Sequence, residues 1–153
     1  TTVPEAVVLA SPRGGLVVTD PATGGLRALP QFRDAMLLNL TPSPDGARVA
    51  FEVYGGNLFT MRLDGSGLVD LGPGARPTWS PDGRWVAFMV TADDGHDITS
   101  SDLVAVRADG SERVALTQSP DRLEMNPSWS PDGRALAFDD AVDGALYLLS
   151  VSE

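Results

Sequence analysis

One tetrapeptide, Ser-Pro-Asp-Gly, occurs three times in the chain and constrains its fold more than any other feature. The copies begin at Ser43, Ser80 and Ser130, which lie 37 and 50 residues apart. An apolar triplet follows each copy at the same distance, as Val49-Ala50-Phe51, Val86-Ala87-Phe88 and Leu136-Ala137-Phe138. Self-similarity of this kind is the signature of a repeat protein, whose units bury their apolar faces against one another. The core is therefore expected between units.

The tetrapeptide has the chemistry of a tight turn. Proline fixes φ at the first central position, aspartate bonds its local backbone, and glycine takes the positive φ that closes the turn. In the triplet, strand alternation places Val49 and Phe51 on one face and Ala50 on the other. Because all three residues are apolar, the pattern predicts strands that are buried on both faces, as in stacked sheets.

A second turn marker, Asp-Gly-Ser, begins at Asp64 and Asp109, which lie 45 residues apart. Short apolar runs separate it from the first marker, and Asp-Gly beside such runs is a strong hairpin signal. Each unit is therefore predicted to form four antiparallel strands, A to D. A helical interpretation fails, because no helical apolar stripe runs free of the 16 Gly and 12 Pro over several turns.

The pattern Pro-x-Trp-Ser-Pro-Asp-Gly-Arg, followed by Ala-Phe and Asp-Gly, resembles the WD-like propeller repeat of TolB-type proteins. Full copies of it begin at Pro77 and Pro127, and the resemblance covers nearly the whole chain. The first copy departs from the pattern, since Thr41-Pro42 replaces the Trp position. The resemblance implies an all-β fold, a β-propeller of four-stranded antiparallel blades. It implies less about function, because one fold hosts many activities.

We expect a single propeller domain over residues 1–153 with about four blade units. The units cover residues 5–30, 39–72, 76–117 and 126–152. The middle two are complete, whereas the first lacks a strand A and the last lacks a strand D. This count does not close a ring cleanly, and three arrangements remain open: a small four-bladed ring with two incomplete blades, which we favour, a larger ring made by two chains, and a fragment of a bigger propeller.

Composition excludes several classes of function. The chain has 21 acidic and 11 basic residues, a net charge of −10 that repels phosphate backbones, so no nucleic-acid partner is expected. The absence of Cys excludes thiolate metal sites, disulfides and thiol catalysis. No apolar run approaches the length of a membrane span, so direct membrane insertion is not expected. The chain opens on Thr1 without an initiator Met, as a processed or trimmed product would.

Catalytic constellations are absent from the sequence. It contains no Gly-x-Ser-x-Gly elbow, and its one histidine, His96, has no second ligand at metal-site spacing. The adjacent carboxylates Asp139 and Asp140 point apart if they lie on a strand. We therefore expect that the chain is not an enzyme.

Residues 91–102 form the candidate metal site. We expect a long loop between strands B and C of the third unit, in which Asp93, Asp94 and Asp97 offer the oxygen ligands that hard cations prefer. The spacing is not that of a dedicated calcium loop. The expectation is thus a solvated acidic loop without a cofactor, and calcium is the alternative.

Two of the three tryptophans have repeat equivalents. Trp79 and Trp129 both precede a Ser-Pro turn and are expected to pack between blades. Trp85 has no aromatic counterpart, because Arg48 and Ala135 stand at its position. Packing at a strand edge is expected for Trp85, with an exposed anchor as the alternative.

Function is expected to lie in the irregular loops. A propeller places its A–B and C–D turns on one face and its B–C and D–A loops on the other, and binding residues concentrate on variable loops of a rigid scaffold. We therefore expect a non-catalytic scaffold that binds protein partners through the B–C and D–A loop face. The candidate contact residues are Phe32, Arg33, Tyr54, Asn57, Arg122, Glu124 and Met125.

The resemblance to TolB-type proteins implies a bacterial-type extracytoplasmic location, periplasmic or extracellular. It also implies partners in a larger envelope or membrane-associated complex. The alternatives are a small-molecule or glycan-binding propeller and the non-catalytic propeller portion of a larger hydrolase.

Overall fold

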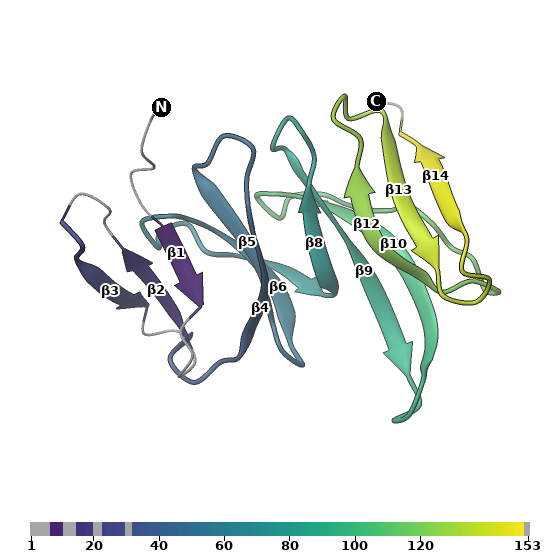
Figure 1. The fold of residues 1–153 in the computed structure, drawn as a ribbon, viewed down its shortest axis with the longest axis horizontal. Helices are drawn as coiled ribbons and strands as arrows, with labels where there is room; N and C mark the ends of the chain where they lie inside the picture. The colour runs from purple at the N-terminus through teal and green to yellow at the C-terminus, as the bar shows by residue number, and fades with distance from the viewer. Residues whose placement is uncertain (1–6, 11–14, 20–22, 30–31, 152–153) are drawn as a thin grey trace.

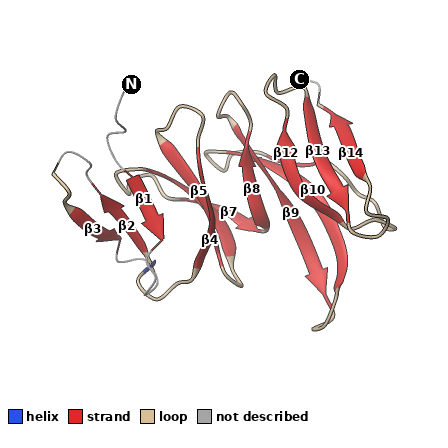
Figure 2. Cartoon of the chain, viewed as in Figure 1, coloured by secondary structure: helices blue, strands red, loops and turns tan. Residues whose placement is uncertain are grey.

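The computed structural model describes residues 7–10, 15–19, 23–29 and 32–151. Within these ranges the chain forms antiparallel β-sheets and no α-helix (Figure 2). The first sheet has three strands, β1 (Val7–Ala10), β2 (Leu16–Thr19) and β3 (Leu26–Leu29). The second has four, β4 (Leu37–Pro42), β5 (Arg48–Val53), β6 (Asn57–Arg62) and β7 (Val69–Pro73).

The third sheet also has four strands, β8 (Ala75–Trp79), β9 (Trp85–Asp93), β10 (Ile98–Arg107) and β11 (Arg113–Ala115). The fourth has three, β12 (Glu124–Trp129), β13 (Ala135–Asp140) and β14 (Leu146–Ser150). In every sheet, strands adjacent in the chain are adjacent in space. The predicted all-β fold, with two complete blades between two incomplete ones, is confirmed.

The repeated tetrapeptide closes the hairpin between the first two strands of a blade. In its first copy the Ser43 hydroxyl donates to Asp45 at 2.6 Å and accepts from the Arg48 amide at 2.9 Å. Gly46 donates its amide to the Ser43 carbonyl at 2.8 Å with φ at 69°. The copies at Ser80 and Ser130 repeat these bonds.

The core lies between the sheets, as the repeat requires. Val49 and Phe51 of β5 pack toward the first sheet, in a cluster with Leu16 and Leu29. Ala50, on the opposite face of β5, packs toward Phe88 of the third sheet. The contact between the third and fourth sheets has the same form and joins the Ala87 face to Leu136 and Phe138.

The four sheets stand side by side along the molecule (Figure 1). The turns at residues 43–47, 80–84 and 130–134 lie together along one edge, which we call the turn edge. The hairpin ends at residues 94–97 and 141–145 lie along the opposite edge, which we call the loop edge. The first and fourth sheets lie at opposite ends of the molecule (Figure 1), so the described residues form an open arc and the favoured expectation of a small four-bladed ring is wrong.

Candidate functional site

Two of the predicted contact residues on the loop edge are buried. Phe32 is 6% exposed, and its ring packs edge-on against Phe51 and Phe59 in the core. Glu124 is 1% exposed, and its carboxylate accepts a hydrogen bond from the Thr117 hydroxyl. The prediction that Phe32 and Glu124 contact a partner is therefore wrong. Both lie in or beside connections that fold down between sheets, which no local pattern reveals.

The other predicted residues differ in availability. Arg33 and Tyr54 are exposed, Tyr54 by 69%. Asn57 donates its amide to the Asp70 carboxylate at 3.0 Å. The Arg122 guanidinium lies 4.1 Å from the Tyr147 ring centre, and Met125 packs against the core between the third and fourth sheets. The seven residues do not converge on one surface.

Residues 91–102 form the end of a long hairpin and not a loop. Strand β9 runs to Asp93, β10 begins at Ile98, and these two residues pair. The prediction of a long loop between these strands is wrong. Thr91, Ile98 and Thr99 are β-branched and suit a strand, so the pairing continues to the tip.

The acidic residues of this hairpin cap their own turn. The Asp93 carboxylate accepts the Gly95 amide at 2.9 Å. The Asp94 carboxylate accepts the amides of His96 at 3.0 Å and Asp97 at 2.9 Å, and these bonds lower the pKa of Asp94. In the part of the chain that the structure describes, no group of three or more His, Cys, Asp or Glu could hold a metal ion.

A groove of about 670 Å³ lies between the third and fourth sheets at the turn edge. Its walls come from the turn at 80–84, the strands β9, β10 and β11, and the turn at 130–134. The side chains that define its character are Trp85, Arg107, Glu112, Val114, Leu116 and Trp129. Its volume lies in the range of about 300–1,000 Å³ that is typical of ligand sites.

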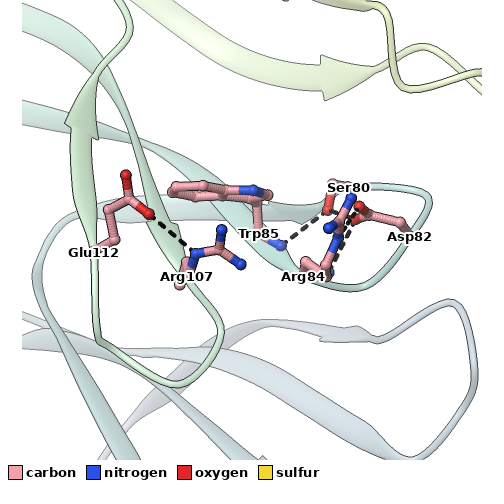
Figure 3. Close-up of polar contacts among 6 residues, drawn as sticks. All are labelled: Ser80, Asp82, Arg84, Trp85, Arg107 and Glu112. Atoms are coloured by element: carbon pink, nitrogen blue, oxygen red, sulfur yellow. Dashed lines mark hydrogen bonds and ion pairs between the residues drawn. The ribbon is translucent and has the colours of Figure 1, made fainter. Parts of the chain in front are cut away.

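Trp85 and Arg107 both line this groove, and their side chains lie against each other (Figure 3). The two residues are directly opposed in the β9–β10 pair. The Arg107 guanidinium lies 4.8 Å from the Trp85 ring centre, and Arg107 Nε donates to the Glu112 carboxylate at 3.0 Å. A cation held against an indole face in this way is both stacked and oriented. Trp85 itself is half-buried and packs against the core cluster between the third and fourth sheets, as expected for packing at a strand edge.

Beside Trp85, the turn contributes a second fixed ion pair. Arg84 Nε donates to the Asp82 carboxylate at 2.6 Å, and the Ser80 hydroxyl donates to the same carboxylate at 2.5 Å. Burial raises the pKa of Asp82, but the hydrogen bonds from Ser80 and Arg84 outweigh it and lower this pKa to about 2. The carboxylate is therefore charged at neutral pH.

Trp129, in the groove wall, differs in its hydrogen bonding from Trp79, which holds the equivalent position one blade earlier. Trp79 Nε1 donates to the Thr41 carbonyl of the preceding sheet at 2.9 Å. Trp129 stands at the same repeat position, yet its buried Nε1 has no hydrogen-bond partner among the described residues. The contact between the third and fourth sheets thus lacks a hydrogen bond that the preceding contact makes.

Of the groove residues, Trp85 stands out in the sequence, whereas Arg107 and Glu112 were not predicted. The signal was present in the repeat, because equal turn positions imply the β9–β10 register and so place Arg107 opposite Trp85. Glu112 follows from the same hairpin, since its carboxylate reaches Arg107 across the turn at Asp109.

A shallower hollow of about 400 Å³ lies among the first strands of the last three sheets. Asn39, Arg76 and Asn126 line it, and each stands four residues before a Ser-Pro turn. All three have a left-handed backbone, with φ at 51°, 59° and 52°. Asn39 Nδ2 donates to Glu52 at 2.7 Å, and Asn126 Nδ2 donates to Asp139 at 3.0 Å.

The fold and the repeated sheet contacts define the chain as a β-propeller. Within that class its fold is TolB-like. Over 97% of the chain it is similar to TolB from Acinetobacter baumannii, with 17% identity, a TM-score of 0.60 and 41% of that chain covered. No protein-family model and no curated protein matches the sequence.

Two further structures are similar. A puromycin-hydrolysing peptidase of Mycobacterium tuberculosis matches 97% of the chain, with 14% identity, a TM-score of 0.75 and 26% of that chain covered. The β-propeller domain of the Trilobed protease from Pyrococcus furiosus matches 78% of the chain, with 18% identity, a TM-score of 0.57 and 41% coverage. The chain thus spans less than half the length of these three proteins. No helix in the described residues is long and apolar enough to cross a membrane.

Proposed function

We propose that this propeller is a non-catalytic scaffold that binds protein partners, and that the Trp85 groove anchors a segment of the partner. The observation that carries the proposal is the Arg107–Trp85 stack in a groove of about 670 Å³. Tryptophan and arginine are the residue types most enriched among binding hot spots. Here both are held in place, which reduces the entropy lost on binding.

The chemistry of the groove favours a segment with one large apolar side chain. Val114 is 40% exposed and, with Leu116, offers apolar surface next to the Trp85 ring. Arg84 and Arg107 stand beside Asp82 and Glu112, so charges of both signs surround that surface. A polar rim around an apolar centre is the usual anatomy of a protein interface.

The loop edge is the second candidate surface, and it is the surface that the sequence predicts to bind protein partners. The Tyr54 amide donates to the Met36 carbonyl at 2.9 Å, so two exposed apolar residues stand on adjacent backbone segments. Arg33 lies in the same connection as Met36. We propose this surface as a secondary contact, because it lacks the depth of the groove.

The similarity to TolB supports an extracytoplasmic location and partners within an envelope or membrane-associated complex, and we propose both. The alternative function is a small-molecule or glycan-binding propeller, or the non-catalytic part of a larger hydrolase. A groove with ordered ion pairs and an indole face suits a sugar ring as well as a peptide. The experiment must therefore separate the two.

Selection of peptides from a random display library against the intact chain tests the proposal. Trp85→Ala is expected to weaken the selected peptides at least about tenfold, as a hot-spot truncation does, and Arg107→Ala to weaken them as well. Trp85→Phe, which keeps a ring on the strand, is expected to retain part of the affinity. Tyr54→Ala, at the proposed secondary contact, is expected to weaken the selected peptides far less than Trp85→Ala does.

Several results would contradict the proposal. Peptides that respond to Tyr54→Ala and ignore Trp85→Ala would move the site to the loop edge. Binding of neutral or acidic oligosaccharides that is lost in Trp85→Ala, without any peptide binding, would support the glycan alternative. Turnover of any bound peptide or sugar would refute the non-catalytic assignment. Circular dichroism of each variant excludes unfolding as the cause.

A further inference from the structure

Four leucines occupy the same position in the four sheets, but only one of them is exposed. Each lies on strand C of its blade, which is β2 in the first sheet because that sheet lacks a strand A. Each pairs with the residue that directly follows the apolar triplet on strand B, and Val7-Val8-Leu9 holds the triplet position in the first sheet. They are Leu16, Leu58, Leu103 and Leu146, with exposed fractions of 1%, 0%, 0% and 84%. Leu146 is thus exposed at a repeat position that is buried in the other three sheets.

The next sheet along the chain covers the first three leucines. Leu58 shares a face with Ala50 and lies in the cluster that contains Phe88. Leu103 shares a face with Ala87 and lies in the cluster that contains Phe138. These two contacts therefore each join the face of one sheet that carries the triplet alanine, its alanine face, to the face of the next sheet that carries the triplet phenylalanine, its phenylalanine face.

The fourth sheet has an alanine face that nothing in the described chain covers. Leu148 pairs with Ala137 and is 78% exposed, next to Leu146. The opposite face of the same sheet is satisfied, since Leu136 and Phe138 are buried against the third sheet. Two adjacent leucines on an unprotected face mark an interaction surface rather than ordinary exposed residues.

The first sheet presents the complementary face at the other end of the arc. Val17 occupies the position of Phe59 and Val104, which face the preceding sheet. Leu26 and Ala28 share the face of Val17 by their pairing, and Leu26 is 73% exposed. The two uncovered faces of the chain are thus the two halves of a contact that the chain makes between each pair of successive sheets.

We propose that a second copy of this chain covers these faces, with the outer face of β12–β14 of one copy packed on the outer face of β1–β3 of the other. The interface is head-to-tail, and it continues the packing already present between successive sheets. With two copies, both ends of each chain are used, and the arc closes into a ring. A heterologous contact that closes yields a discrete oligomer.

Sedimentation equilibrium of the intact chain tests this proposal. A single species of twice the 16.1 kDa chain mass is expected at micromolar concentration. The double variant Leu146→Asp, Leu148→Asp is expected to weaken dimerisation at least about 100-fold, since it places charge at the interface centre. Both side chains are exposed within one copy, so the monomer keeps its fold. Met36→Asp, at another exposed apolar position, is expected to remain dimeric.

Mixing two variants distinguishes this contact from a symmetric one. Leu26→Asp damages the first sheet only and is expected to be monomeric on its own. Mixed with the Leu146→Asp, Leu148→Asp variant, it still offers an intact fourth sheet to an intact first sheet, and a heterodimer is expected. A parent chain that stays monomeric, a dimer that survives the double variant, or a mixture that yields no heterodimer overturns the proposal.

Discussion

A serine hydroxyl and an aspartate carboxylate repeat the same short-range bond at each blade turn. The Ser43 hydroxyl lowers the pKa of Asp45, and Ser130 does the same for Asp132. At Asp82, burial opposes the effect but the Ser80 and Arg84 bonds prevail, and the pKa is lowered to about 2. At the scale of the residue, each turn thus contains a carboxylate that is more acidic in the folded chain than in the unfolded one.

This lowering makes stability depend on pH in a defined direction. A carboxyl whose folded pKa lies below the unfolded value of 3.8 stabilises the fold fully above that value, and the contribution is lost as pH falls toward about 2. The melting temperature is therefore expected to fall between about pH 4 and pH 2. The triple variant Asp45→Asn, Asp82→Asn, Asp132→Asn is expected to melt lower at neutral pH and to show a flatter profile at constant ionic strength. An unchanged slope would show that these turns do not carry the dependence.

At the scale of the element, a residue with a left-handed backbone conformation recurs near the start of the first strand in each of the last three sheets. At Asn39, Arg76 and Asn126 the strand register shifts, which forms a bulge. Asparagine tolerates this backbone, whereas most other residues pay a steric cost for it. The two asparagines also donate their amides to acids on the next strand.

Arg76 is the strained member of this set, and its replacement by glycine is expected to stabilise the chain. Glycine adopts positive φ freely, so Arg76→Gly should raise the free energy of unfolding by about 1 kcal/mol. Asn39→Gly is the matched control and should not stabilise, because it loses the bond to Glu52 at 2.7 Å. Urea titration of both variants measures the difference. Equal effects of the two glycines would contradict the assignment of strain to Arg76.

The β9–β10 hairpin gives a prediction about cations. Its carboxylates cap backbone amides of their own turn, so calcium and magnesium are expected to act alike and weakly, through screening of the net charge of −10. A real site at a free calcium level of about 100 times Kd would stabilise the fold by about 2.7 kcal/mol. A calcium-specific rise in melting temperature, abolished by Asp94→Asn with Asp97→Asn, would refute this expectation.

At the scale of the whole molecule, stability depends on the contacts between sheets. Trp79 and Trp129 stand at equivalent positions in two of these contacts, so their variants allow the two contacts to be compared. Trp79 Nε1 donates to Thr41 of the preceding sheet, whereas Trp129 Nε1 is buried without a partner in the described residues. Trp79→Phe removes this hydrogen bond and leaves the Thr41 carbonyl without its indole donor, whereas Trp129→Phe removes a donor that has no partner. The first change is therefore expected to cost about 1–3 kcal/mol more than the second. Chemical denaturation of the two variants checks the order, and equal costs would contradict it.

The sequence by itself determined the local and periodic features of this protein. The Ser-Pro-Asp-Gly turns depend on bonds that reach at most five residues, as from Arg48 to Ser43. The two faces of each strand follow from alternation alone. For these reasons the blade count, the strand order and the positions of Trp79 and Trp129 could be predicted.

Only the tertiary structure decided which side chains remain available for binding. Phe32 and Glu124 lie in or beside irregular connections, and their burial depends on how two sheets meet, which no local pattern encodes. The groove lies between the third and fourth sheets, and its lining, with the stack of Arg107 on Trp85, comes from strands and turns that only the packing of the two sheets brings together. Leu146 has the same sequence environment as Leu58 and Leu103, yet it is exposed. Burial is a property of what packs against a residue, and in a repeat protein that partner is always the next unit.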